Sequence, residues 1–154
     1  MAKTRRQAEL ALTVQYPGGS RGAPTRPQLR RWVRASCGLP AEVTLRFVGA
    51  EERRQLNRDW RRKDHATNVL SFPYESGTRI CGDLVLCSEV VEREAAEQGK
   101  SPEAHYAHLV VHGMLHLQGH DHERSRADAR RMEALEREIL ATLGYPDPYD
   151  GLQR

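Results

Sequence analysis

A cluster of histidines in the second half of the chain could bind a metal ion. Five of the seven histidines lie between residues 108 and 122. In a helix, His112 and His116 project from one face, one turn apart, with imidazoles close enough to share an ion. We expect Gly119 to end that helix in a left-handed conformation, so that the chain turns and His122 reaches the same ion. Three neutral imidazoles suit zinc and leave its fourth tetrahedral position to water, as in catalytic zinc sites.

Two other interpretations of these histidines are weaker. A single histidine on a helix is more often an ordinary structural residue, and we expect His105 to be no more than polar surface. The spacing of His112, His116 and His122, His-x3-His-x5-His, matches the zinc motif of metzincin proteases. Those enzymes place a glutamate directly after the first histidine as general base, but this chain has Gly113 there. A protease would need another carboxylate near the metal, and Glu123 is the nearest in sequence.

Three motifs of the chain resemble those of one known family. Residues 112–122 read His-Gly-Met-Leu-His-Leu-Gln-Gly-His-Asp-His, which is similar to the signature of the YbeY family, bacterial endoribonucleases of ribosomal RNA maturation. Residues 56–73 resemble that family's Leu-Asn-x-x-x-Arg and Thr-Asp-Val-Leu-Ser-Phe-Pro, and residues 82–86 give a third match. In the family's order, the resemblance covers the chain from about residue 43 to 143. This chain has Asn68 where the family has aspartate. The amide keeps the shape of the side chain but removes its charge.

The resemblance implies a site and its chemistry. One zinc ion, held by three histidines and a water molecule, would promote hydrolysis of a phosphodiester bond. Arg61 matches an arginine that acts near the metal in the family, and it would stabilise the added negative charge. His108 lies one helical turn before the first ligand, where it could orient that ligand or move protons. The general base stays open between the zinc-bound hydroxide, His108 and a group on the RNA.

The implied function is that of a zinc-dependent, single-strand-specific endoribonuclease. Its substrate would be ribosomal RNA, particularly the 3′ end of the small-subunit precursor, and it would also act in ribosome quality control. Its partners would be ribosomal particles and assembly proteins. An alternative is a non-catalytic ribosome assembly factor in which zinc is structural, and a metalloprotease is a weaker one.

A cluster of basic side chains supports a nucleic-acid partner. The net charge is only +3, but six cations crowd one segment predicted as helix, residues 51–62, and the turn that follows. These cations are Arg53, Arg54, Arg58, Arg61, Arg62 and Lys63. The planar arginine fork donates two hydrogen bonds to a phosphate, so this face suits an RNA backbone. Composition alone fits a solvated helix face equally well, and the family resemblance favours RNA.

Length and composition predict one domain in the cytoplasm. The 154 residues, 38% hydrophobic and 29% charged, suffice for a single core over residues 1–154, with loose ends at 1–8 and 145–154. No apolar run has the roughly 20 residues that a membrane helix needs, and the start does not resemble a secretory signal. Three cysteines, an odd number, indicate reduced thiols rather than a disulfide framework. Oligomeric state stays open.

The periodicity of apolar residues predicts an α+β domain. Alternation indicates strands at residues 9–16, 42–48, 68–73 and 83–86. Capping residues and apolar stripes indicate helices within residues 25–38, 51–62, 88–98, 101–118 and 125–143. We therefore expect one small mixed sheet of about four strands, covered by about five helices, with the zinc site on a helix and the turn after it. A cleft between the zinc helix and the arginine-rich helix would hold the site.

Overall fold

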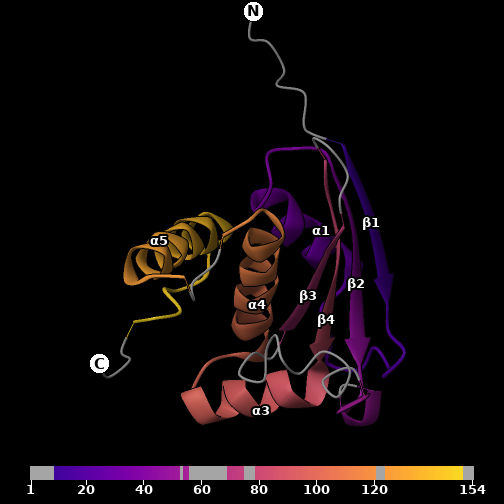
Figure 1. Cartoon of the computed structure of the whole chain (residues 1–154). Coiled ribbons are helices and arrows are strands. Elements are labelled where there is room, and N and C mark those ends of the chain that lie inside the picture. Colours follow the sequence, from indigo (N-terminus) through magenta and orange to yellow (C-terminus); the bar gives the residue numbers. More distant parts are fainter. Residues whose placement is uncertain (1–8, 53, 56–68, 75–78, 121–123, 151–154) are drawn as a thin grey trace, which may run out of the picture.

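The fold is a four-stranded mixed sheet packed against helices (Figure 1). The computed structural model describes residues 9–52, 54–55, 69–74, 79–120 and 124–150. Its elements are β1 (Leu10–Gln15), α1 (Arg26–Ala35), β2 (Ala41–Val48), β3 (Val69–Tyr74), β4 (Ile80–Cys87), α3 (Ser88–Gln98), α4 (Pro102–Leu117) and α5 (Arg126–Leu143). Residues 50–52 and 54–55 are also helical, and the rest of the predicted helix 51–62 lies outside the described residues. The α+β class and the number of strands are as predicted from the sequence.

The sheet has the order β1-β2-β4-β3, and only β3 runs against its neighbours. The β1–β2 and β2–β4 pairs are parallel, whereas β3 and β4 are antiparallel. Alternate residues of β2, among them Val43, Leu45 and Phe47, are buried in the main core. This alternation produces one strongly apolar face, which the helices cover.

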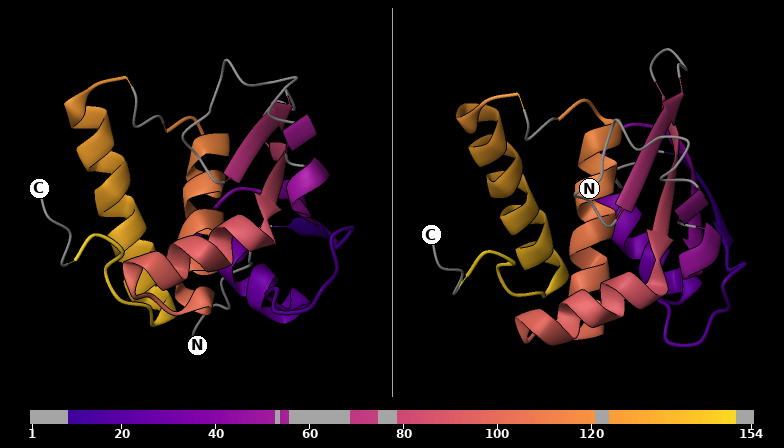
Figure 2. Two further views of the ribbon diagram at one scale, coloured as in Figure 1. Left: turned by 90° about the horizontal axis from the view of Figure 1, so that it is seen from below. Right: turned by 60° about the horizontal axis from the view of Figure 1, so that its bottom comes forward.

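Helix α4 is the central element of the helical layer. It lies between the sheet on one side and α5 on the other, and α1 and α3 pack against it as well (Figures 1 and 2). Nine of its sixteen residues are buried, so helix α4 is nearly surrounded by protein. The histidine positions of α4 are therefore held by contacts on several sides, which restricts movement of the helix axis.

Two glycines allow α4 to lie close to β4. A Cβ atom at Gly113 would meet the Leu84 side chain at 2.9 Å, and one at Gly82 would meet the Leu117 side chain at 2.6 Å. Real Cβ contacts are almost never this short, so a larger residue would require the leucine side chain or the helix itself to move. Gly113, which follows His112, and Gly82, which precedes Asp83, are therefore packing residues between the histidine helix and the sheet.

Side-chain caps start the helices largely as predicted. Thr25, Ser101 and Ser125 cap α1, α4 and α5, each accepting a hydrogen bond from a backbone N–H three residues later. Helix α3 has no side-chain cap and begins at Ser88, because β4 continues in extended conformation through Cys87 and leads directly into the helix.

Two predictions, the end of helix α1 and the loose segment after α5, need correction. Helix α1 ends at Ala35 and not near Gly38, because the Ser36 hydroxyl donates to the Trp32 carbonyl at 2.8 Å and competes with continued helix. Residues 145–150, expected to begin a loose end, pack against the domain instead. The Tyr145 ring contacts Trp32 edge-on at 5.9 Å, and Pro148 is buried.

Among the helices that the structure describes, none is long and apolar enough to cross a membrane.

Candidate metal centre

Three of the predicted site residues lie along helix α4. His108 and His112 are one turn apart, with ring centroids separated by 6.4 Å. His116 follows one turn later and is exposed, whereas His112 is half-buried. The row of imidazoles therefore runs from the buried interior of the helical layer to the surface at the end of α4.

Helix α4 ends in the turn that the sequence predicts. Gly119 has a φ of +98°, which is the left-handed region. Its N–H donates to the His116 carbonyl at 3.0 Å, and the N–H of His120 donates to the Leu115 carbonyl at 3.1 Å. These two bonds form a Schellman motif, which reverses the chain direction directly after His116.

Several predicted site residues lie outside the described residues. His122 follows the turn at Gly119, and Glu123 follows His122. Arg61 and Asn68 belong to the undescribed residues 56–68. The structure therefore brings together His108, His112 and His116 on α4, and the positions of the third ligand and the arginine stay predictions.

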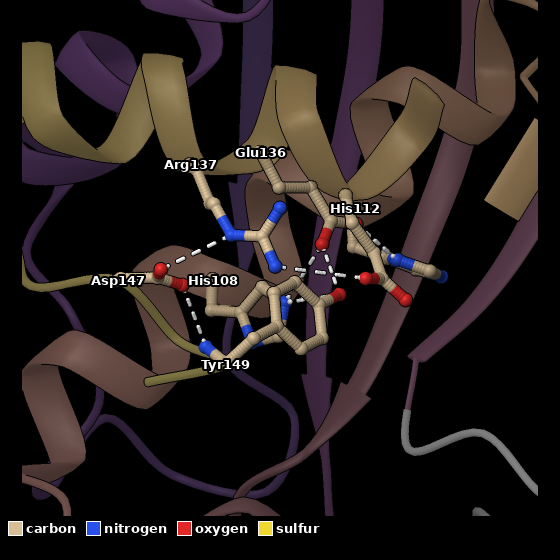
Figure 3. Close-up of polar contacts among 7 residues, drawn as sticks. His108, His112, Glu136, Arg137, Asp147 and Tyr149 are labelled. Atoms are coloured by element: carbon tan, nitrogen blue, oxygen red, sulfur yellow. Dashed lines mark hydrogen bonds and ion pairs between the residues drawn. The ribbon is translucent and has the colours of Figure 1, made fainter. Parts of the chain in front are cut away.

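A buried carboxylate, Glu136 of α5, joins two of these histidines. Its Oε2 lies 2.6 Å from Nδ1 of His112, and its Oε1 lies 3.1 Å from Nε2 of His108 (Figure 3). The side chain is fully buried. A carboxylate at Nδ1 holds the proton on that nitrogen, so the metal-binding lone pair of His112 is on Nε2. Glu136 therefore has the position of the carboxylate partner that orients metal-ligating histidines.

The charge of Glu136 is stabilised by the histidines. Burial by itself would raise the pKa of this carboxyl group, but hydrogen bonds from His108 and His112 outweigh it and hold the pKa at about 2. The carboxylate is thus ionised at neutral pH and acts purely as an acceptor. An ionised acceptor favours proton donation by both rings.

Sequence reasoning missed Glu136, although a signal exists. From the sequence, Met132, Leu135, Ile139 and Leu143 form the apolar stripe of the predicted helix 125–143. In the structure, Met132, Glu136 and Leu140 are the buried residues of α5, at intervals of four. An acidic residue within a buried helical stripe requires a partner, and here the partners are histidines of the predicted site.

The position of His108 favours one of its two predicted roles. Its Nε2 is shared between Glu136 and the Tyr149 hydroxyl, at 3.1 and 3.3 Å. Its Nδ1 is buried, with no hydrogen-bond partner among the described residues. These contacts suit orientation of the Glu136 carboxylate better than proton transfer to a substrate. The neighbouring His105, expected at the surface, is instead buried and contacts Glu94 at 3.0 Å.

Two histidines on α4, His112 and His116, have the spacing of a zinc half-site. Within the described residues, no group of three His, Cys, Asp or Glu side chains could hold a metal ion. The second ring nitrogen of His112 bonds a carboxylate, one of the acceptors that metal-ligating histidines use, and His116 lies one turn further along. Two imidazoles with this spacing are typical of a helical zinc half-site, which is completed by a third ligand.

The position of Gly113 gives a physical reason against a protease. Gly113 is buried and faces Leu84 of the sheet, so a glutamate at this position would not lie beside the predicted metal ligands. The described carboxylate that contacts the predicted site, Glu136, is hydrogen-bonded to the His112 ring itself. Neither position offers a general base of the metzincin kind.

Replacing Gly113 with glutamate is therefore expected to destabilise the protein. The new side chain would collide with Leu84 and would bring a carboxylate into an apolar interface, at a cost of at least about 2 kcal/mol. Urea unfolding of the metal-free protein measures this loss. A Gly113→Glu variant with unchanged stability and new peptidase activity would contradict the assignment of Gly113 to packing.

The described part of the arginine-rich segment is a solvated surface. Arg54 is exposed and pairs with Glu51 at 2.8 Å, within the same helical turn. Glu52 pairs with Arg46 of β2 at 2.6 Å. These local ion pairs contribute little stability. They account for one of the six cations and leave the predicted role of the other five untested.

Comparison with known proteins identifies the family. The model of a family described as Endoribonuclease YbeY matches residues 28–144. A protein of that name from Aromatoleum aromaticum is 58% identical over 145 residues, covering 92% of this chain and 94% of its own. Another from Methylibium petroleiphilum is 55% identical over 141 residues, covering 91% and 94%. A solution structure from Thermotoga maritima, 26% identical, matches with a TM-score of 0.55 and covers 92% of this chain and 99% of its own. The chain therefore belongs to the YbeY family of endoribonucleases.

Proposed function

We propose that this endoribonuclease is zinc-dependent and cleaves single-stranded RNA at a site built on the end of α4. The observation that carries the proposal is the contact between Glu136 and Nδ1 of His112, 2.6 Å long, one turn before the exposed His116. A buried carboxylate on the far nitrogen of a histidine is the usual support of a metal ligand. The ligands in this proposal are His112, His116 and His122.

Residues of α4, of the turn after it and of α5 have separate roles in the proposed zinc site. Glu136 and His108 hold the His112 ring so that Nε2 points away from α5. Gly119 turns the chain directly after His116, and His122 is proposed as the third ligand. When bound there, zinc supplies a Lewis acid that activates water and polarises a phosphoryl oxygen.

Arg61 is proposed as the residue that stabilises charge during cleavage. Attack on a phosphodiester adds negative charge to the non-bridging oxygens. A guanidinium group donates two hydrogen bonds to such oxygens and keeps its positive charge at any relevant pH. Its resemblance to the arginine in the family motif supports this role, and the neighbouring cations would bind the RNA backbone.

The proposed substrate is ribosomal RNA, particularly the 3′ end of the small-subunit precursor. The proposal includes a second role in ribosome quality control, with ribosomal particles and assembly proteins as partners. It also includes a cytoplasmic location, which the three cysteines support because none forms a disulfide. Family membership and the basic segment favour an RNA partner over a protein substrate.

Cleavage of a labelled single-stranded RNA tests the proposal. Purified protein is compared before chelation, after chelation and after zinc is restored, with metal content measured on each sample. We expect one zinc per chain, loss of cleavage on chelation and recovery with zinc. The Arg61→Ala variant should keep its zinc but cleave about 100-fold more slowly, as when an electrostatic stabiliser of the transition state is removed.

Arg30→Ala is the control, because Arg30 is an exposed arginine on α1 and lies outside the basic segment. It should cleave within about twofold of wild type. Equal cleavage by every variant, with or without chelator, would identify a contaminating nuclease. Stable zinc without cleavage would instead support the assembly factor with structural zinc.

A further inference from the structure

The chain segment after α5 reaches the proposed metal centre through Tyr149. The Tyr149 hydroxyl hydrogen-bonds Oε1 of Glu136 and lies 3.3 Å from Nε2 of His108 (Figure 3). The Tyr149 ring also meets the His108 ring edge-on, with centroids 5.4 Å apart. A residue near the end of the chain thus contacts both the carboxylate that orients His112 and the histidine beside it.

Tyr149 is held in place by contacts that do not involve the histidines. The Arg137 guanidinium lies over the Tyr149 ring at 5.3 Å and donates from Nε to Asp147 at 3.0 Å. The other oxygen of Asp147 accepts from the backbone N–H of Tyr149 at 2.8 Å. Arg137 and Asp147 therefore fix both the ring and the backbone of Tyr149 (Figure 3).

The hydroxyl of Tyr149 completes the hydrogen bonding of a buried charge. One oxygen of Glu136 accepts from His112, and the other accepts from His108 and Tyr149. Burial and the neighbouring Glu136 raise the pKa of Tyr149, so the phenol keeps its proton and donates it. Three donors on two oxygens hold the carboxylate group in one rotational position.

We propose that Tyr149 is a positioning residue for the metal centre, which fixes Glu136 in the orientation that presents Nε2 of His112 to the metal. This inference rests on the proposed zinc site. It makes residues 145–150 part of the functional site, because Tyr149 reaches the first ligand through only one intermediate side chain. The hydroxyl carries the effect, whereas the ring contacts His108 and Arg137.

Zinc affinity tests the role of the hydroxyl. The Tyr149→Phe variant keeps the ring and its contact with Arg137 but removes the donor to Glu136. We expect its zinc dissociation constant, measured by competition with a chromogenic chelator, to rise about 3- to 10-fold. This is below the 10- to 100-fold range for a direct partner of a ligand. The matched control is Tyr145→Phe, whose hydroxyl bonds Glu103 away from the histidines and whose affinity should stay within twofold.

A double-mutant cycle with Glu136→Gln separates positioning from general destabilisation. If Tyr149 acts through Glu136, Tyr149→Phe should weaken zinc binding in the wild-type background but cause no further loss in the Glu136→Gln background. Equal losses in both backgrounds would overturn the proposal. Thermal unfolding of the metal-free proteins shows whether each variant is folded at the assay temperature.

Arg137→Gln provides a second variant if Tyr149→Phe does not fold. It removes the group that holds the Tyr149 ring and leaves every donor to Glu136 in place, so a smaller loss of zinc affinity is expected. If wild type binds zinc and both variants bind it with the same affinity, the role of Tyr149 is overturned but the proposed metal site is not. Absence of zinc binding by wild type overturns the proposed metal site and this inference with it.

Discussion

Replacement of His116 by alanine is expected to reduce zinc affinity and RNA cleavage by roughly 1,000-fold. Structural zinc sites bind with about 10–16 kcal/mol, so one protein ligand of three or four is worth about 4 kcal/mol, or roughly three orders of magnitude. The exposed position of His116 means that the substitution leaves the core intact. The measurements are zinc dissociation constants by chelator competition and cleavage rates of a labelled single-stranded RNA.

His120→Ala is the control for this prediction. His120 lies four residues after His116 and beyond the turn at Gly119, and its contribution to that turn is a backbone N–H that alanine retains. Its zinc affinity should remain within about twofold of wild type. Comparable losses in His116→Ala and His120→Ala would show that the turn, and not the ligand set of His112, His116 and His122, controls binding.

Local sequence patterns predicted the parts of the site that depend on neighbours in the chain. The serine caps, the left-handed Gly119 and the helical row of histidines all follow from interactions within about five residues. The four strands were predicted for the same reason, because alternation is visible within a single strand. These features could be read from the sequence because their energies are set locally.

The support for the histidines could not be predicted in that way. Glu136 is 24 residues from His112, and Tyr149 is 41 residues from His108. The pairing of these residues depends on how α5 packs against α4 and on how the chain returns after Gly144. The tail after α5 is rich in Pro, Asp and Gly, a composition that indicates disorder unless long-range contacts hold it. Here Arg137, Asp147 and Tyr149 provide those contacts.

The two sides of α4 have different roles in the site. On the sheet side, Gly113 and Gly82 permit close approach of helix and strand, which fixes where the helix lies. On the α5 side, Glu136 determines the rotation and tautomer of His112. Position and orientation are thus set by separate contacts, so substitutions on the two sides should have distinguishable effects. Gly113→Glu should act mainly on stability, whereas Glu136→Gln should act on both stability and zinc affinity.

Replacement of Glu136 by glutamine is expected to lower zinc affinity 10- to 100-fold and to cost roughly 3 kcal/mol of stability at pH 7. The first effect follows from loss of the carboxylate that orients His112. The second follows from linkage, because a carboxyl whose pKa falls from 4.5 to about 2 on folding stabilises the folded state by about that amount. Urea unfolding of the metal-free proteins isolates the second effect.

The stability lost in Glu136→Gln is expected to depend on pH. The folded-state pKa of Glu136 is depressed, so its stabilisation is fully present above pH 4.5 and is lost as the pH falls towards 2. The difference in unfolding free energy between wild type and Glu136→Gln should therefore be constant from pH 7 to 5 and shrink at pH 4 and 3. Glu138→Gln, an exposed substitution on the same helix, should differ little from wild type at any of these pH values. A difference that persists unchanged at pH 3 would mean that glutamine disturbs packing, and that the ionised carboxylate is not what stabilises the folded protein.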